Sequence, residues 1–105
     1  PLWLAPEQAR LLPVSEQFLD YAKDTAAKMR AVGIRAEVDI SGDRLGKLIR
    51  NAEKQKIPVM AVVGAKEVET NTLSIRTRAS GELGSVAVTE VIEKMKNAIT
   101  NFDNF

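Results

Sequence analysis

Acidic and basic side chains alternate in two short runs in the second half of the chain. Glu67 and Glu69 precede Asn71-Thr72, and Arg76 and Arg78 follow it. If Asn71-Thr72 is a two-residue loop, the runs form an antiparallel hairpin that pairs Glu67 with Arg76. A carboxylate accepts from guanine N–H groups, and a guanidinium donates to carbonyl and ring-nitrogen acceptors. The pattern therefore predicts either a surface that reads nucleobase edges or a cross-strand ion pair worth about 1 kcal/mol or less. A three-residue loop would reverse the two faces.

A stripe of basic residues lies earlier in the chain. Its members recur at helical spacing, away from the apolar positions 45, 48, 49 and 52, and are Arg44, Lys47, Arg50 and Lys54. Residues 44–78 carry a formal charge of +5, whereas residues 1–43 and 79–105 each carry −2. The stripe is either a solvated helix face or a surface that follows phosphates, where each cation adds salt-dependent affinity.

Two glycine-containing loops are weaker candidates for binding. Ser41-Gly42-Asp43 leads into the basic helix, whose first N–H groups suit an anion, although the same loop reads as a capping turn with Asp43 as the N-cap. Residues 81–85 hold two glycines but lack the strand-to-helix context of a phosphate-binding loop. We therefore expect residues 81–85 to be a connector.

Composition excludes several kinds of chemistry. The 105 residues include no cysteine and no histidine, which removes disulfide scaffolds, Cys- or His-ligated zinc, thiol nucleophiles and triads that need an imidazole. Hydrophobic residues make up 45% and the net charge is +1, as expected for one folded domain. No apolar run long enough to cross a bilayer and no signal peptide are visible, so we expect a soluble, cytoplasmic protein without membrane contact.

Periodicity predicts an α/β fold. The expected strands are 10–14, 35–40, 59–63, 67–70 and 73–78, and the expected helices are 16–32, 43–56 and 88–102. Strands that alternate with helices favour parallel pairing, and the hairpin adds antiparallel strands. The prediction is a three-layer, mixed five-stranded sheet flanked by three helices. Because the chain opens on Pro1 and an apolar Leu2-Trp3-Leu4, we expect residues 1–9 to be a linker from an upstream domain and 10–105 to be the domain.

Seven segments, in order along nearly the whole chain, resemble the C-terminal anticodon-binding domain of threonyl-tRNA synthetases. They are residues 3–8 (WLAPEQ), 33–39 (GIRAEVD), 45–50 (LGKLIR), 57–58 (IP), 64–69 (GAKEVE), 75–78 (IRTR) and 83–85 (LGS). The GAKEVE and IRTR segments are the more specific, whereas the others are shared with the prolyl, histidyl and glycyl class II relatives.

The resemblance implies recognition of a threonine tRNA anticodon stem-loop, whose last two anticodon bases are G and U. Glu67 would accept from the guanine, and Arg76 would reach the guanine and the uracil. Arg78, Arg44, Lys47 and Arg50 would meet phosphates. Related sequences often carry Arg-Asn-Glu-Lys after the second strand, and a base-contacting Asn would align with Gly42, so that contact is either absent or made by the main chain.

The resemblance also implies that catalysis belongs to a parent ligase, a homodimer that uses ATP, Mg and Zn in domains upstream of this chain. The domain itself is expected to carry no catalytic residue and no cofactor. Three other hypotheses stay open. The first is the anticodon-binding domain of another class II synthetase, of the prolyl, histidyl or glycyl kind. The second is a flavodoxin-like nucleotide-binding domain, which the strand and helix order permits, and the third is a purely structural or dimerisation domain.

Overall fold

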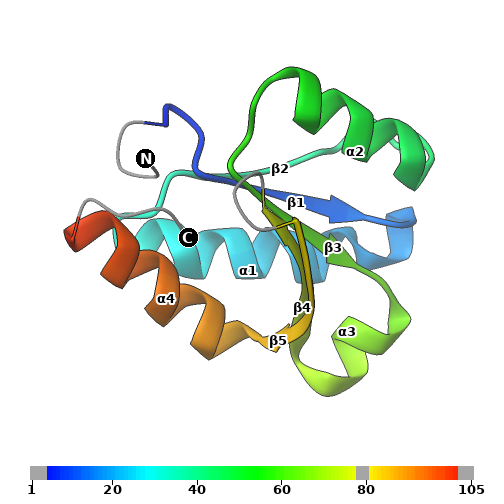
Figure 1. Cartoon of the computed structure of the whole chain (residues 1–105). Helices are drawn as coiled ribbons and strands as arrows, with labels where there is room; N and C mark the ends of the chain where they lie inside the picture. Colours follow the sequence, from blue (N-terminus) through cyan, green and yellow to red (C-terminus); the bar gives the residue numbers. More distant parts are fainter. Residues whose placement is uncertain (1–4, 78–80, 102–105) are drawn as a thin grey trace.

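The computed structural model describes residues 5–77 and 81–101, in which helices and strands alternate (Figure 1). In chain order the elements are β1 (Ala9–Pro13), the 3-10 helix η2 (Glu16–Phe18), α1 (Leu19–Ala31), β2 (Ala36–Val38), α2 (Leu45–Lys54), β3 (Val59–Val63), α3 (Ala65–Thr70), β4 (Thr72–Thr77), β5 (Gly81–Ala87) and α4 (Val88–Thr100). The predicted α/β class and mixed five-stranded sheet are confirmed. The predicted helix count is wrong, because the described residues form four α-helices rather than three.

The five strands form one sheet in the order β2-β1-β3-β4-β5. β1 runs parallel to both β2 and β3, whereas β3 with β4 and β4 with β5 are antiparallel. The chain moves outward from β1 to β2 and then returns past β1 to β3. Because right-handed crossovers are the rule, this reversal puts α1 and α2 on opposite faces of the sheet.

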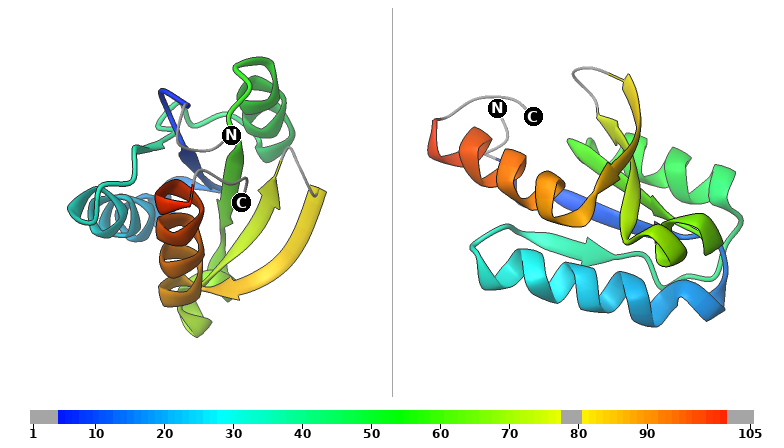
Figure 2. Two further views of the ribbon diagram at one scale, coloured as in Figure 1. Left: turned by 60° about the vertical axis from the view of Figure 1, so that its left-hand side comes forward. Right: turned by 90° about the horizontal axis from the view of Figure 1, so that it is seen from below.

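The first face carries the larger core. α1 and α4 lie side by side on it (Figure 2) and supply buried residues such as Met29, Val91 and Met95. Every second residue of the strands points to them, including Leu11, Ala61 and Ile75. The helix predicted at 88–102 is therefore α4, and its apolar side packs on the sheet.

The second face is only partly covered. α2 packs Leu48 and Ala52 against Leu12 and Met60 of the two central strands, which forms a separate, smaller core. Beyond α2, the same face of β4 presents Thr72, Ser74 and Arg76, which are half-buried and polar. The sheet therefore has a polar ledge beside α2, formed by β4 and β5.

The hairpin predicted around Asn71-Thr72 is wrong. Residues 65–70 are the short helix α3. β4 pairs antiparallel with β3 and with β5, and β5 includes the residues 81–85 predicted to be a connector. Asn71, at φ 54, is the left-handed residue that ends α3. Glu67 is therefore not paired with Arg76. Arg76 is instead opposite Met60 in β3 and Glu82 in β5.

The N-cap of the basic helix lies one residue later than predicted. The N-cap residue is Arg44, with no side-chain cap, and not Asp43. The Asp43 carboxylate instead lies 3.7 Å from the Lys47 ammonium one turn on. Gly33 follows α1 with φ 88, a left-handed conformation that is typical of a residue just after a helix.

Side-chain hydrogen bonds hold the segment that enters the sheet. The Arg35 guanidinium donates to the Ala5 carbonyl at 2.8 and 3.0 Å, and the backbone N–H of Arg35 donates to the buried side chain of Gln8 at 2.8 Å. Arg10 donates to both carboxylate oxygens of Glu7, at 2.7 and 2.8 Å, and to Gln55 beyond α2 at 2.6 Å. The hydrogen bond with Glu7 raises the pKa of Arg10, although burial opposes it.

Candidate nucleic-acid interface

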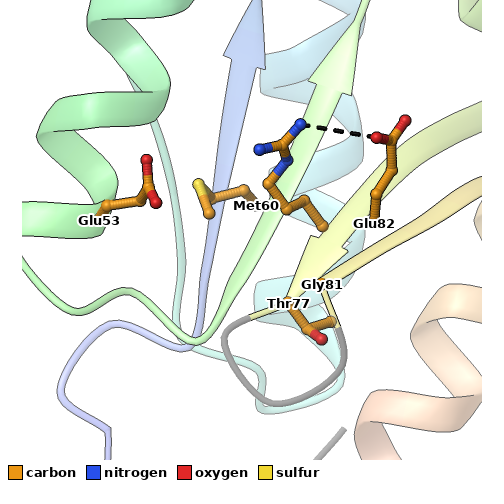
Figure 3. A pocket seen from close by; sticks show the side chains of 6 residues that line it. Glu53, Met60, Thr77, Gly81 and Glu82 are labelled. Atoms are coloured by element: carbon orange, nitrogen blue, oxygen red, sulfur yellow. Dashed lines mark ion pairs between the residues drawn. The ribbon is translucent and has the colours of Figure 1, made fainter.

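A hollow of about 470 Å³ lies between α2 and the polar ledge (Figure 3). Its lining consists of Glu53, Met60, Arg76, Thr77, Gly81 and Glu82. Met60 is an apolar wall that is only 2% exposed, whereas the Arg76 side chain is 41% exposed. The hollow therefore combines a partly exposed guanidinium with a nearly buried apolar side chain.

The Arg76 guanidinium has one ion-pair partner among the described residues. Its Nη2 lies 3.6 Å from a carboxylate oxygen of Glu82, and the Glu82 side chain is 66% exposed. An exposed pair at this distance contributes little to stability. Glu82 pairs with only one end of the Arg76 guanidinium. The other N–H groups of Arg76 are available to a ligand.

The predicted basic stripe is present along α2 and its N-cap residue. Its four members, Arg44, Lys47, Arg50 and Lys54, are all exposed. Arg50 stands one turn before Glu53, so the stripe neighbours a residue that lines the hollow. The stripe and Arg76 thus lie on the same face of the sheet, although they come from different elements.

Glu67 occupies a different place from the one predicted. It lies in α3 and is only 8% exposed, and its Oε1 accepts from the Gly64 backbone N–H at 2.8 Å. This bond caps the helix at its third position. Arg76 lies four residues along β4 from Thr72, so roughly 13 Å of strand separates the α3 corner from the hollow.

Tyr21 supports the α3 corner from α1. Its hydroxyl donates to the Thr72 carbonyl at 3.0 Å and lies 3.4 Å from Oδ1 of Asn71. Burial raises the pKa of Tyr21, and the negative charge of Glu67 raises it further. The corner therefore holds a neutral phenol and a buried carboxylate at fixed positions.

Gly42 lies in a second hollow of about 290 Å³ at the carboxyl ends of β1 and β2. The exposed Gly42 adopts φ 76, and the lining also includes Ser15, Asp39 and Asp43. Asp39 accepts from the Ser41 N–H at 3.0 Å, which shapes the loop. Gly42 thus sits at the same sheet edge as Glu67, whereas Arg76 lies toward the opposite edge.

The structure therefore brings Arg76 and Arg50 toward one hollow and leaves Glu67 and Gly42 outside it. Arg78 lies outside the described residues. The sequence patterns do not indicate Glu53 or Glu82, which come from α2 and β5 and meet Arg76 only in three dimensions. The spacing Gly64-x-x-Glu67, followed by Asn71, is the signal that identifies α3, because it matches a helix cap, a third-position carboxylate and a helix stop.

Comparison with known proteins defines the family. Residues 8–98 match the family model described as the anticodon binding domain. The chain belongs to this family. The fold and the sequence resemblance agree with that assignment, and the domain boundaries of the match include all five strands and nearly all of α4.

The anticodon binding domain is similar to part of longer enzymes. It is 67% identical over 105 residues to a threonine--tRNA ligase of Synechocystis sp., covering 100% of this chain and 17% of that protein. It is 54% identical over 99 residues to the chloroplastic/mitochondrial threonine--tRNA ligase 2 of Arabidopsis thaliana, covering 94% of this chain and 15% of that protein. The chain thus spans about one-sixth of the length of these relatives.

Solved structures share the fold. The RNA binding domain of threonyl-tRNA synthetase from Cryptosporidium parvum superimposes with a TM-score of 0.86 at 26% identity, over 92% of this chain and 24% of that one. Histidyl-tRNA synthetase from Nostoc sp. gives a TM-score of 0.82 at 20% identity, over 90% and 23%. Within the described residues, no helix is both long enough and apolar enough to span a membrane.

Proposed function

We propose that this domain is the anticodon-binding part of a threonine--tRNA ligase and that it reads the G and U of the threonine anticodon. The observation that carries the proposal is the 67% identity along the whole chain to a threonine--tRNA ligase. The domain would dock the anticodon stem-loop so that the acceptor end of the tRNA reaches a catalytic domain of the same chain.

Arg76 is the main base-reading residue in this proposal. Its exposed guanidinium stands beside the apolar wall of Met60, where an unstacked base can enter and present its edge. Glu67 is proposed to accept from the guanine through Oε2, because its Oε1 already accepts from Gly64. The strand length between the two residues fits two neighbouring bases of a splayed loop better than a single base.

The basic stripe is proposed to follow the RNA backbone. Arg44, Lys47 and Arg50 are exposed cations on the helix that borders the hollow. Arg78 is also proposed to contact phosphates. Gly42 is proposed to contact the RNA through its main chain, at the carboxyl ends of β1 and β2. These contacts position the RNA without reading its sequence.

The whole ligase is proposed to be a cytoplasmic homodimer. Its catalytic domain would use ATP, Mg and Zn for aminoacylation, in parts of the protein outside this chain. This chain supplies tRNA selection only.

Titration with two RNA stem-loops tests the proposal. One loop carries the threonine anticodon, and in the other the G and U are exchanged; both are added to the chain at low salt, and backbone amide shifts are followed by NMR. We expect saturable binding that favours the native loop and shifts the amides of Arg76 and of the start of α2. Equal affinity for the two loops would refute base reading.

Two substitutions separate base reading from phosphate binding. Arg76→Ala is expected to weaken the native loop about tenfold and to remove the preference between loops, because a bidentate base contact is worth roughly 1–3 kcal/mol. Arg50→Ala should weaken both loops alike and reduce the salt slope by about 0.7. Lys94→Ala, which removes an exposed cation on α4, is the control and should change neither.

A further inference from the structure

A bulge in the hairpin decides which residue faces Arg76. Ile75 is opposite Gly84, but the next residue, Arg76, is opposite Glu82, so the register skips Leu83. Gly84 adopts φ 79, which a glycine accepts easily and which the bulge requires. Without the bulge, the exposed apolar side chain of Leu83 would lie across from Arg76. The bulge therefore places a carboxylate there instead.

A second carboxylate faces the hollow from the other side. Figure 3 shows Glu53 on α2 and Glu82 on β5 at opposite sides, with the ion pair between Arg76 and Glu82 drawn as a dashed line. Glu53 and Glu82 are both exposed, and both line the hollow. The described lining thus carries two negative charges and one positive charge, although the adjacent face of α2 is basic.

This arrangement is the reverse of a phosphate site. A phosphate bound at Arg76 would share the hollow with the carboxylates of Glu53 and Glu82, and like charges brought together cost binding energy. A nucleobase edge is neutral, so it meets no net repulsion and still offers acceptors to Arg76. Phosphates are drawn instead to the basic stripe outside the hollow.

We propose that Glu53 and Glu82 are specificity-determining residues that exclude phosphate from Arg76 and so reserve it for a nucleobase. The inference rests on the proposed function for its RNA ligand. It adds that the carboxylates of Glu53 and Glu82 repel the phosphates of the RNA from the base site. It assigns roles to two residues that the resemblance does not include.

Charge-neutralising variants with a matched control test the inference. Glu53→Gln and Glu82→Gln each remove one negative charge from the hollow. Glu90→Gln removes one from α4, where Glu90 is 57% exposed and lies 3.5 Å from Lys94, much as Glu82 pairs with Arg76. All three variants change the net charge of the chain by the same amount. Glu82→Asp keeps the charge and serves as a rescue.

The readouts are affinity for the native loop, for the loop with G and U exchanged, and for an abasic oligonucleotide that offers phosphates without bases. We expect Glu53→Gln and Glu82→Gln each to raise affinity for the abasic strand about threefold, with a steeper salt dependence, and to reduce the preference for the native loop. Glu90→Gln should do neither, and Glu82→Asp should behave as the unmodified chain. A variant that had merely lost structure would bind every RNA less well.

The outcomes for the two proposals are distinct. If the abasic strand binds Glu82→Gln and Glu53→Gln no better than Glu90→Gln, phosphate exclusion is overturned, even when the unmodified chain prefers the native loop. If the unmodified chain shows no preference between loops, but the abasic strand binds Glu82→Gln more tightly, base reading fails while phosphate exclusion stands.

Discussion

The two ends of β4 use charged residues in opposite ways. At the start of the strand, Glu67 is buried, caps α3 and lies near the phenol of Tyr21. At the other end, Arg76 is exposed and shares a hollow with carboxylates that leave most of its donors unused. One end is closed by internal hydrogen bonds, and the other is open to a ligand. A charged side chain that alternates with apolar residues in a sequence can thus belong to either kind of region, and only its partners tell which.

The largest effect expected from this comparison is at the closed end. Glu67→Ala leaves the buried Gly64 N–H without an acceptor, so the free energy of unfolding should fall by about 2 kcal/mol in urea denaturation. Glu67→Gln keeps an acceptor oxygen and should lose less than half as much. Glu69→Ala, an exposed position of the same helix, should stay within about 0.5 kcal/mol. Equal losses for Glu67→Ala and Glu69→Ala would mean that the cap contributes nothing.

A pair of glycine substitutions sharpens the contrast in packing. A Cβ at Gly64 would lie 3.1 Å from Oε1 of Glu67 and 3.3 Å from Cγ2 of Val14. Gly64→Ala should therefore lower the free energy of unfolding by about 1 kcal/mol. A Cβ at Gly46 in α2 would meet nothing within 4 Å, so Gly46→Ala should raise it by about 0.5–1 kcal/mol. Thermal unfolding of both variants measures whether each substitution stabilises or destabilises the fold. A stabilising effect of Gly64→Ala would contradict the close packing around Gly64.

The open end should be nearly neutral for folding. Arg76→Ala removes only an exposed ion pair at 3.6 Å, and the free energy of unfolding should change by no more than about 0.5 kcal/mol. Urea denaturation of this variant, beside the RNA titration already described, measures stability and binding separately. A loss as large as that of Glu67→Ala would assign Arg76 a structural role and erase the difference between the two ends.

The smallest effect concerns pH at the closed end. The pKa of Tyr21 is raised by burial and by Glu67, so the folded protein holds the phenol proton more tightly than the unfolded chain. The stability that this proton contributes is complete below the ordinary tyrosine pKa of about 10 and is lost as pH rises through the higher folded value. Between pH 9 and pH 12 the unmodified chain should therefore lose stability relative to Tyr21→Phe, which has no phenol to titrate.

Tyr21 is the only tyrosine in the chain, so its titration can be followed directly by ultraviolet absorbance. Glu67→Gln should lower the observed pKa, because it removes the second cause of the shift. An unchanged titration curve in Glu67→Gln would mean that the charge of Glu67 does not affect Tyr21. Burial alone would then account for the raised pKa of Tyr21.

The sequence predicts the parts of this fold that follow a regular pattern. The strand predicted at 59–63 is β3, and the helices predicted at 16–32 and 88–102 correspond to α1 and α4. The alternation within β4 also places Arg76 and Ser74 on the same polar face. These predictions succeed because each depends on residues close together in the chain.

The wrong predictions concern residues 65–70 and 81–87, where the local sequence pattern does not indicate the secondary structure that forms. Residues 65–70 are too short for a helical period to be visible, although alanine, lysine and glutamate favour helix over strand. Glycines at 81 and 84 suggested a connector, but they serve the twisted, bulged strand β5 through positive φ angles of 73 and 79. The hollow at Arg76 was beyond prediction from pattern, because its acidic residues come from α2 and from the far side of that bulge.

The entry segment has a mechanical consequence. Between Ala5 and Arg10 the backbone is tied to Arg35 beside β2 and, through Arg10, to Glu7 and Gln55. This segment cannot rotate relative to the sheet without breaking several charged or buried hydrogen bonds at once. A force applied at Ala5 is therefore transmitted directly to the sheet. Residues 5–10 therefore move together with the sheet.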